Sequence, residues 1–211
     1  REYVYLPPNI TLDRGGLSIK SSATLAVYLS DALNYLVQYP YGCSEQIASK
    51  LSSLAILKRG LNIKNVGDAF AIKDVEFEGK KYTPDDVARI GLARLYENQT
   101  PNGGFIYYQG MQPDFYLTLH IINALVDLKN AGYPVDVSKL DQGAKYLYRE
   151  LTQKNELIQN KDLVILAMYT LSRVDGFLIN PELQNRVTAI ASDTKYVNEN
   201  ISNESLAYLA M

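Results

Sequence analysis

The sequence has very little cysteine and histidine, with one of each in 211 residues. A single cysteine cannot form an intrachain disulfide, and no cluster of histidine and cysteine is available to bind zinc. No apolar run approaches the roughly 18 residues of a membrane span, and no signal peptide begins at Arg1. The net charge of −2 provides no basic surface for nucleic acid or for a membrane. We therefore expect no metal, no cofactor, no nucleic-acid partner and no insertion of this segment into a membrane.

Apolar residues make up 47% of the chain, and most of them recur at helical spacing. Thr83-Pro84-Asp85-Asp86 is a strong helix start, because it combines a capping threonine, a proline in the first turn and two acids. Several helices show apolar residues on more than one side, which is typical of helices buried on two faces. The sequence predicts short helices in succession at about 22–38, 43–60, 84–97, 114–131, 138–153, 160–173 and 181–192, with another opening near 202.

Two segments differ from this helical pattern. Residues 68–82 alternate apolar and polar side chains around a turn at Gly79, which predicts a short β-hairpin between helices. Residues 1–20 are expected to be an extended lead-in from a preceding domain. The last residues, 205–211, are amphipathic without a cap, so residues 21–211 are interpreted as one domain truncated at its C-terminal end. The fold class is mainly α, and the absence of a strict repeat favours a closed toroid of antiparallel helix pairs over a solenoid.

The most informative residues are Cys43 and Gln46, in the sequence Tyr39-Pro40-Tyr41-Gly42-Cys43-Ser44-Glu45-Gln46. A thiol and a carboxamide at this spacing can condense: the sulfur attacks the side-chain carbonyl carbon of Gln46 and ammonia leaves. The product is an internal thioester, a stored electrophile that an amine or hydroxyl captures once.

The neighbouring residues suit this chemistry. Cys43 begins a helix, whose positive end stabilises a thiolate and makes the sulfur a better leaving group. Gly42 allows a tight turn beside the sulfur, and Glu45 occupies the ordinary place of an acid in a first helical turn. Tyr39 and Tyr41 are suited to exclude water from the bond, although an ordinary role in an aromatic core explains them equally well.

This motif resembles the thioester signature of the alpha-2-macroglobulin and complement family in its bacterial form. A second segment, Asn98-Gln99-Thr100-Pro101-Asn102-Gly103-Gly104-Phe105, is similar to the Gly-Gly-Phe segment that follows the signature in that family. The helix leading into the motif and the helix after the second segment are also similar, so the resemblance covers most of the chain.

The resemblance implies an α/α toroid in which Cys43 donates the sulfur and Gln46 the acyl carbon. Tyr39 would shield the bond together with a residue of a neighbouring domain. A protease would cut a bait region elsewhere in the polypeptide, and an amine of that protease would then be captured covalently. The implied protein is a single-turnover protease inhibitor outside the cytoplasm, in the periplasm or cell envelope or secreted, and not an enzyme.

Two departures from the family pattern bear on the acceptor. Ser44 stands where vertebrate members usually have glycine. Some complement members use a histidine about a hundred residues after the motif to direct the acyl group to hydroxyls, but the matching stretch at 156–160 has none. His120 lies too early for that role and is interpreted as a packed helix residue. The sequence therefore favours direct reaction with amines.

Three other functions stay open at this point. A cysteine hydrolase would need His120 beside Cys43 as a base, and nothing in the sequence places it there. An enzyme of the α/α toroid type would need clustered aspartates or a metal, whereas Asp85 and Asp86 are better explained by a helix start. A covalent surface adhesin uses the same thioester for anchoring.

Overall fold

The computed structural model describes residues 42–62, 74–77, 80–177, 179 and 181–193, with short stretches at 32, 34–35, 197, 201–202 and 205–207. The expected extended lead-in at 1–20 lies outside the described residues. So does most of the helix expected at 22–38, of which residues 32, 34 and 35 are helical. Residues 205–207 are helical where another helix was expected to open.

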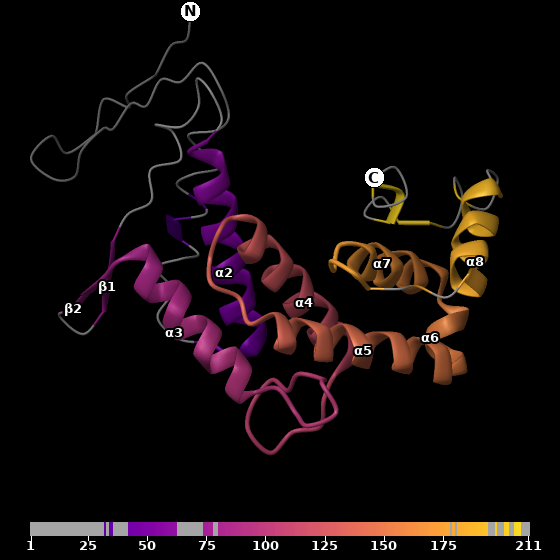
Figure 1. Cartoon of the computed structure of the whole chain (residues 1–211), viewed down its shortest axis with the longest axis horizontal. Helices are drawn as coiled ribbons and strands as arrows, with labels where there is room; N and C mark the ends of the chain where they lie inside the picture. Colours follow the sequence, from indigo (N-terminus) through magenta and orange to yellow (C-terminus); the bar gives the residue numbers. More distant parts are fainter. Residues whose placement is uncertain are drawn as a thin grey trace, which may run out of the picture.

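The described part of the chain is mainly helical, as predicted (Figure 1). A two-stranded antiparallel hairpin lies between the first two helices of this part, and it pairs Val75 with Tyr82 and Phe77 with Lys80. The elements in chain order are α2 (Ser44–Gly60), β1 (Val75–Phe77), β2 (Lys80–Tyr82), α3 (Pro84–Glu97), α4 (Phe115–Asn130), α5 (Val137–Gln153), α6 (Asn155–Gln159), α7 (Lys161–Ser172) and α8 (Pro181–Ser192).

Local sequence accounts for most of these boundaries. The Thr83 hydroxyl accepts a hydrogen bond from the Asp86 N–H, and the Asp86 carboxylate bonds the Thr83 N–H in return. This reciprocal cap is worth about 1 kcal/mol and begins α3 where predicted. The helix α6 was not predicted, because five residues are too few to show a helical period.

The helices α2, α4 and α7 form one layer. The helix α4 contacts both α2 and α7, while α3 packs on α2, α5 on α4 and α7, and α8 on α7. Bonds between Ser49 and His120 at 3.1 Å and between Asn123 and Thr170 at 2.8 Å join successive helices of this layer. Further along, Lys58 lies 3.8 Å from the ring centre of Tyr133, just beyond α4. Since these partners ascend together in sequence, α2, α4 and α7 run parallel, with their N-termini at the same end.

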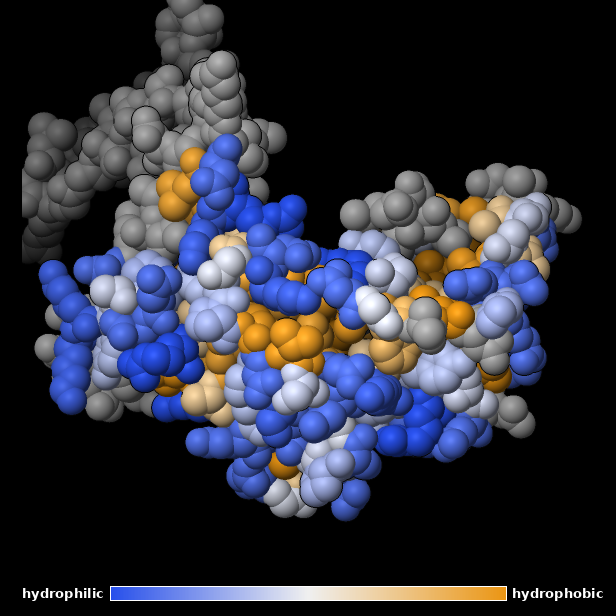
Figure 2. Space-filling model, viewed as in Figure 1, coloured by the Kyte–Doolittle hydropathy of each residue, from blue (hydrophilic) through white to orange (hydrophobic). Residues whose placement is uncertain are grey.

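The core is centred on α4, which has buried neighbours on three sides. Its apolar residues on several faces are buried, including Leu117, Ile121 and Leu125. This confirms the expectation that the helix is buried on more than one face. The face shown in Figure 2 is mainly hydrophilic, and apolar residues appear in the hollow at its centre.

Tyr133 provides a test of this packing. Its ring is 5% exposed, and its hydroxyl has no hydrogen-bond partner within the described residues. Burial, followed by the negative charge of Asp85, raises the pKa of Tyr133 to about 12. An unfolded tyrosine titrates near pH ~10, so it loses its proton at a lower pH than folded Tyr133 does. The free energy of unfolding is therefore not lowered by this titration below that pH, and it falls as the pH rises toward 12.

The Tyr133→Phe variant is therefore expected to be up to ~1 kcal/mol more stable than the parent at pH 7, since it removes a buried hydroxyl without a partner. It should also lose less stability at high pH. Urea unfolding at neutral pH and above pH 10 measures both effects. Tyr146→Phe is the control for the effect at pH 7, because the Tyr146 hydroxyl has an acceptor in the Pro113 carbonyl oxygen at 3.5 Å. Burial raises the pKa of Tyr146 to about 12 as well, so both variants should lose less stability at high pH. A destabilised Tyr133→Phe protein at pH 7 would contradict the prediction.

Candidate functional site

The site is built at the N-terminus of α2. Cys43 is the N-cap residue, with an extended backbone (φ −65°, ψ 174°), and it is partly exposed. Gln46, in the first turn, has its side chain folded back toward the cap. Its Oε1 accepts a hydrogen bond from the Cys43 backbone N–H at 3.1 Å. The thiol and the carboxamide named by the sequence are thus held on the same turn.

Gly42 makes this folded-back conformation possible. A Cβ atom at position 42 would lie 2.6 Å from the Gln46 Cβ and 3.1 Å from its Oε1. Contacts of 2.6 Å are not tolerated between carbon atoms, so any side chain at Gly42 would push the carboxamide away. The glycine expected for a tight turn is therefore also needed as space for the acyl donor.

Ser44 connects the helix start to the second segment of the sequence resemblance. It is fully buried, and its hydroxyl donates to the Ile106 carbonyl oxygen at 2.7 Å. The same hydroxyl accepts from the Asn98 side-chain amide at 2.8 Å. The Ser44 backbone N–H donates to the Tyr107 carbonyl oxygen at 3.3 Å. The first residue of α2 is thereby fixed to the loop 98–113.

This loop is held in turn by its glycines and by Gln99. Gly103 has φ +93°, and a Cβ there would lie 2.2 Å from the Gln142 carbonyl oxygen of α5. The Gln99 amide donates to the carbonyl oxygens of Gly103 at 3.0 Å and Lys139 at 2.8 Å. Phe105 is fully buried and its N–H donates to the Thr118 hydroxyl of α4 at 2.8 Å. The loop is thus bonded to α2, α4 and α5.

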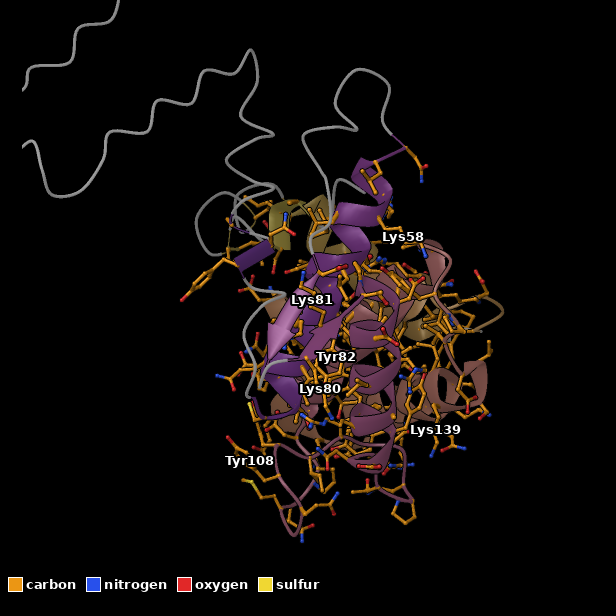
Figure 3. All side chains as sticks on the ribbon, turned by 90° about the vertical axis from the view of Figure 1, so that its left-hand side faces the viewer. Lys58, Lys80, Lys81, Tyr82, Tyr108 and Lys139 are labelled. Atoms are coloured by element: carbon orange, nitrogen blue, oxygen red, sulfur yellow. The ribbon has the colours of Figure 1, made fainter. Side chains whose placement is uncertain are left out.

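Tyr107 lies at the same end of the molecule. Burial raises the pKa of its phenol, and nearby Asp114, Glu45 and Cys43 add to the shift in that order. Asp114, Glu45 and Cys43 are therefore near enough to Tyr107 to favour its neutral phenol. Tyr108 is exposed, and Figure 3 shows it at the opposite end of the molecule from Lys58, which lies in the last turn of α2.

Some predicted site residues cannot be placed. Tyr39, Pro40 and Tyr41 lie outside the described residues, so the expected shielding by Tyr39 stays a prediction. Glu45 is exposed in the first turn of α2, the position expected of an acid near the positive end of a helix. Within the described residues no group of three histidine, cysteine, aspartate or glutamate side chains could hold a metal ion.

His120 contributes to a different part of the molecule. Its Nε2 lies 3.1 Å from the Ser49 hydroxyl oxygen. Ser49 is six residues beyond Cys43, or about 9 Å along the helix axis. His120 is partly exposed and lines a pocket of about 630 Å³ between α2, α4 and α7. The histidine is therefore a helix residue, as interpreted from the sequence, and it is hydrogen-bonded to Ser49 of the neighbouring helix α2. It also faces a pocket.

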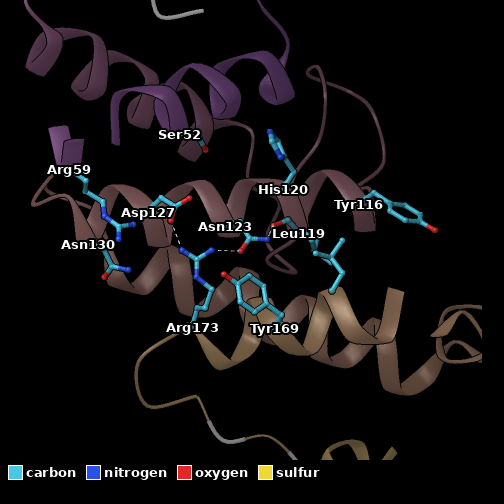
Figure 4. Close-up of a pocket in the computed structure, with 11 residues that line it drawn as sticks. Ser52, Arg59, Tyr116, Leu119, His120, Asn123, Asp127, Asn130, Tyr169 and Arg173 are labelled. Atoms are coloured by element: carbon cyan, nitrogen blue, oxygen red, sulfur yellow. Dashed lines mark hydrogen bonds and ion pairs between the residues drawn. The ribbon is translucent and has the colours of Figure 1, made fainter. Parts of the chain in front are cut away.

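The pocket is polar and does not contain Cys43 (Figure 4). Arg173, the C-cap residue of α7, donates to the Asn123 side-chain oxygen at 2.8 Å and forms an ion pair with Asp127. Both partners lie on α4, so these bonds fasten the two helices together. Tyr169 also lines the pocket, and the Arg173 guanidinium lies over its ring at 5.3 Å.

Sequence reasoning gave no role to Ser44 and Asn98. Ser44 was treated only as a departure from the vertebrate pattern, and Asn98 only as the first residue of a similar segment. A polar residue inside the thioester motif was the one available signal. Nothing in the sequence indicated that its partner lies 54 residues later.

Comparisons with known proteins agree with the family suggested by the motif. No family model matches the chain. It is 30% identical to alpha-2-macroglobulin of Escherichia coli (strain K12) over 136 residues, which is 64% of this chain and 7% of that protein. The chain resembles bacterial alpha-2-macroglobulins.

Two further relatives have the same name. The protein of Xylella fastidiosa (strain Temecula1) is 28% identical over 200 residues, 90% of this chain and 11% of that protein. That of Thermotoga maritima is 26% identical over 120 residues, 56% of this chain and 7% of that protein. These matches support the bacterial alpha-2-macroglobulins as the related family. The chain spans about a tenth of the length of these curated relatives. No described helix is long and apolar enough to cross a membrane.

Proposed function

We propose that this chain is the thioester domain of a bacterial alpha-2-macroglobulin-like protease inhibitor. The observation that carries the proposal is the conformation of Gln46, whose carboxamide is folded onto the N–H of Cys43. Closure forms a bond between Cys43 Sγ and the side-chain carbonyl carbon of Gln46. The bond to Gln46 Nε2 breaks, and the thiol proton leaves with the nitrogen as ammonia. No oxidant, metal or cofactor is needed.

The proposed activity is a single covalent capture. After a protease cuts a bait region elsewhere in the polypeptide, an amine of that protease attacks the thioester carbonyl. An amide forms, the carbon–sulfur bond breaks, and the proton passes from the amine to the released thiolate. The protein is consumed in the reaction, so it acts as a trap that is used once. Its proposed targets are broad classes of protease.

An amine acceptor is favoured by the surroundings of the bond. The stretch where complement members have an assisting histidine corresponds to α6 and Asn160, which contain none. The single histidine, His120, is bonded to Ser49. An amine attacks a thioester without a general base more readily than a hydroxyl does, so no histidine is required.

The proposed fold is an α/α toroid. The parallel arrangement of α2, α4 and α7, with α3, α5 and α8 packed outside them, supports this proposal. The relatives are many times longer than this chain, so neighbouring domains of the same polypeptide are proposed partners. The proposed location is outside the cytoplasm, where target proteases are met.

The polar pocket is the one observation that favours a toroid enzyme instead. It contains His120 and Asp127, which are common acid–base groups. However, Asp127 is held in an ion pair with Arg173, and the described residues contain no group of three side chains that could hold a metal ion. A covalent adhesin would use the same bond as the inhibitor and differs only in what it captures.

Intact-mass spectrometry of the native protein, with and without methylamine, tests the thioester. The expected mass before treatment is lower than the sequence mass by one ammonia, and Cys43 should resist alkylation. Methylamine should add covalently at Gln46 and release one thiol. A freely alkylated Cys43 in fresh native protein would contradict the proposal. Conjugates with proteases, as opposed to surface ligands, would separate the inhibitor from the adhesin.

A further inference from the structure

We propose that the backbone N–H of Cys43 stabilises the acyl oxygen of Gln46 during thioester chemistry, and that Asn98, acting through Ser44, is the positioning residue for this N–H. The inference rests on the proposed thioester. It adds to it a named hydrogen-bond donor for the reacting carbonyl and a residue, 55 positions after Cys43 in the sequence, that controls the bond's reactivity.

The argument begins with the fate of the Gln46 oxygen. Closure removes Nε2, whereas Oε1 stays as the carbonyl oxygen of the thioester. When an amine later attacks the same carbon, Oε1 again becomes negatively charged in the tetrahedral intermediate. It already accepts a bond from the Cys43 N–H at 3.1 Å. Oxyanion donors lie about 2.7–3.1 Å from the charged oxygen, and in the open form this N–H is already directed at the oxygen on which the charge develops.

The donor is available because of its place in the helix. N–H groups at a helix start have no carbonyl partner within the helix, and the field of the helix there favours negative charge. Gly42 leaves the space in which the carboxamide reaches this N–H. The backbone itself therefore supplies the stabilising group, and no side chain of the motif has to do so.

The orientation of the Cys43 N–H depends on the next residue. Ser44 is bonded through its own N–H to Tyr107 and through its hydroxyl to Ile106. Asn98 donates to the same hydroxyl at 2.8 Å, which leaves the hydroxyl proton for the Ile106 carbonyl. Gln109 donates to the Asn98 side-chain oxygen at 2.6 Å and so fixes which end of that amide faces Ser44.

The donated proton makes the role of Asn98 testable with an isosteric change. Asn98→Asp keeps the shape of the side chain but replaces the donor to Ser44 with an acceptor, so the bonds that fix Ser44 have to rearrange. Asn160→Asp is the matched control. Asn160 caps α7 as an acceptor for the Leu163 N–H at 3.1 Å, and aspartate can do the same.

The experiment uses the thioester-bearing protein and two readouts. The first is the rate of thiol release by methylamine. The second is the infrared stretching frequency of the thioester carbonyl, labelled with ¹³C at Gln46, because this frequency rises when a hydrogen bond to the oxygen is lost. We expect Asn98→Asp to slow thiol release about tenfold, consistent with the cost of sub-ångström misplacement, and to raise the carbonyl frequency. Asn160→Asp should change neither.

The outcomes separate this inference from the proposed function. If the unmodified protein lacks the ammonia-deficient mass, the thioester itself is absent. If the thioester is present and Asn98→Asp changes neither rate nor frequency, the positioning role is wrong. A folded Asn98→Asp protein that fails to close the bond supports the inference, because closure passes through the same oxyanion. If Asn98→Asp does not fold, Ser44→Ala tests the same connection with the same readouts.

Discussion

Cys43→Ala is expected to abolish covalent capture of a protease while leaving the fold intact. Without the sulfur, Gln46 stays an ordinary carboxamide, which amines do not attack under these conditions. The variant keeps the backbone N–H that bonds Gln46, and its helices should be unchanged. The measurement is the amount of conjugate that survives denaturation and reduction on a gel after incubation with a protease.

Ser49→Ala is the control for this variant. It also removes one polar group from α2, and it breaks the contact between Ser49 and His120. Capture should continue in this protein, since the proposed reaction uses no histidine. Conjugates that persist in Cys43→Ala would show that the acyl donor lies elsewhere, and loss of capture in Ser49→Ala would show that the contact between Ser49 and His120 is needed for capture.

Gly103→Ala is expected to cause the largest loss of stability among single methyl additions in the loop. The added Cβ would lie 2.2 Å from a backbone oxygen at Gln142, and the residue would keep a φ of +93°. Strain of this kind and overpacking each cost about 1–3 kcal/mol, so a loss of about 3–5 kcal/mol is expected. Urea unfolding of the purified protein measures it.

The same loop contains a matched control at Gly110. Its φ is +86°, but a Cβ there meets no atom within 4 Å. Gly110→Ala therefore isolates the conformational cost, about 1–3 kcal/mol. Equal losses in the two variants would mean that the close approach of Gly103 to α5 contributes nothing. A much larger loss at Gly103 would confirm that the loop has no room to move away from α5.

The sequence predicted the helices well because their signals are local. Apolar spacing and the cap at Thr83 depend on residues within a few positions of one another, and the predicted helices that fall within the described residues are present as α2, α3, α4, α5, α7 and α8. The proximity of Cys43 and Gln46 was also predictable, since they are three positions apart on one helical turn. The helix α6 was missed because it is shorter than the pattern that identifies a helix.

What the sequence could not predict is the surroundings of the pair. The burial of Ser44 and its bond to Asn98 arise only when α2 packs against the loop that follows α3. Similarly, the need for glycine at 103 comes from a carbonyl of α5, 39 residues later in the chain. Long-range contacts of this kind have no periodic signature. The pocket beside His120 was missed for the same reason, because three separate helices form it.

The bond between Ser44 and Asn98 also limits how this sequence can change during evolution. A buried hydroxyl and a half-buried amide are bonded to each other across 54 residues. Replacing Ser44 alone would leave the Asn98 amide without this acceptor, and replacing Asn98 alone would remove one of the bonds that hold the Ser44 hydroxyl. The loss of one such bond costs about 1 kcal/mol. Drift at either position is therefore opposed, and a lineage that replaces the serine with an apolar residue is expected to replace the asparagine as well. The two positions are therefore expected to change together, so the proposed thioester motif extends beyond its eight consecutive residues.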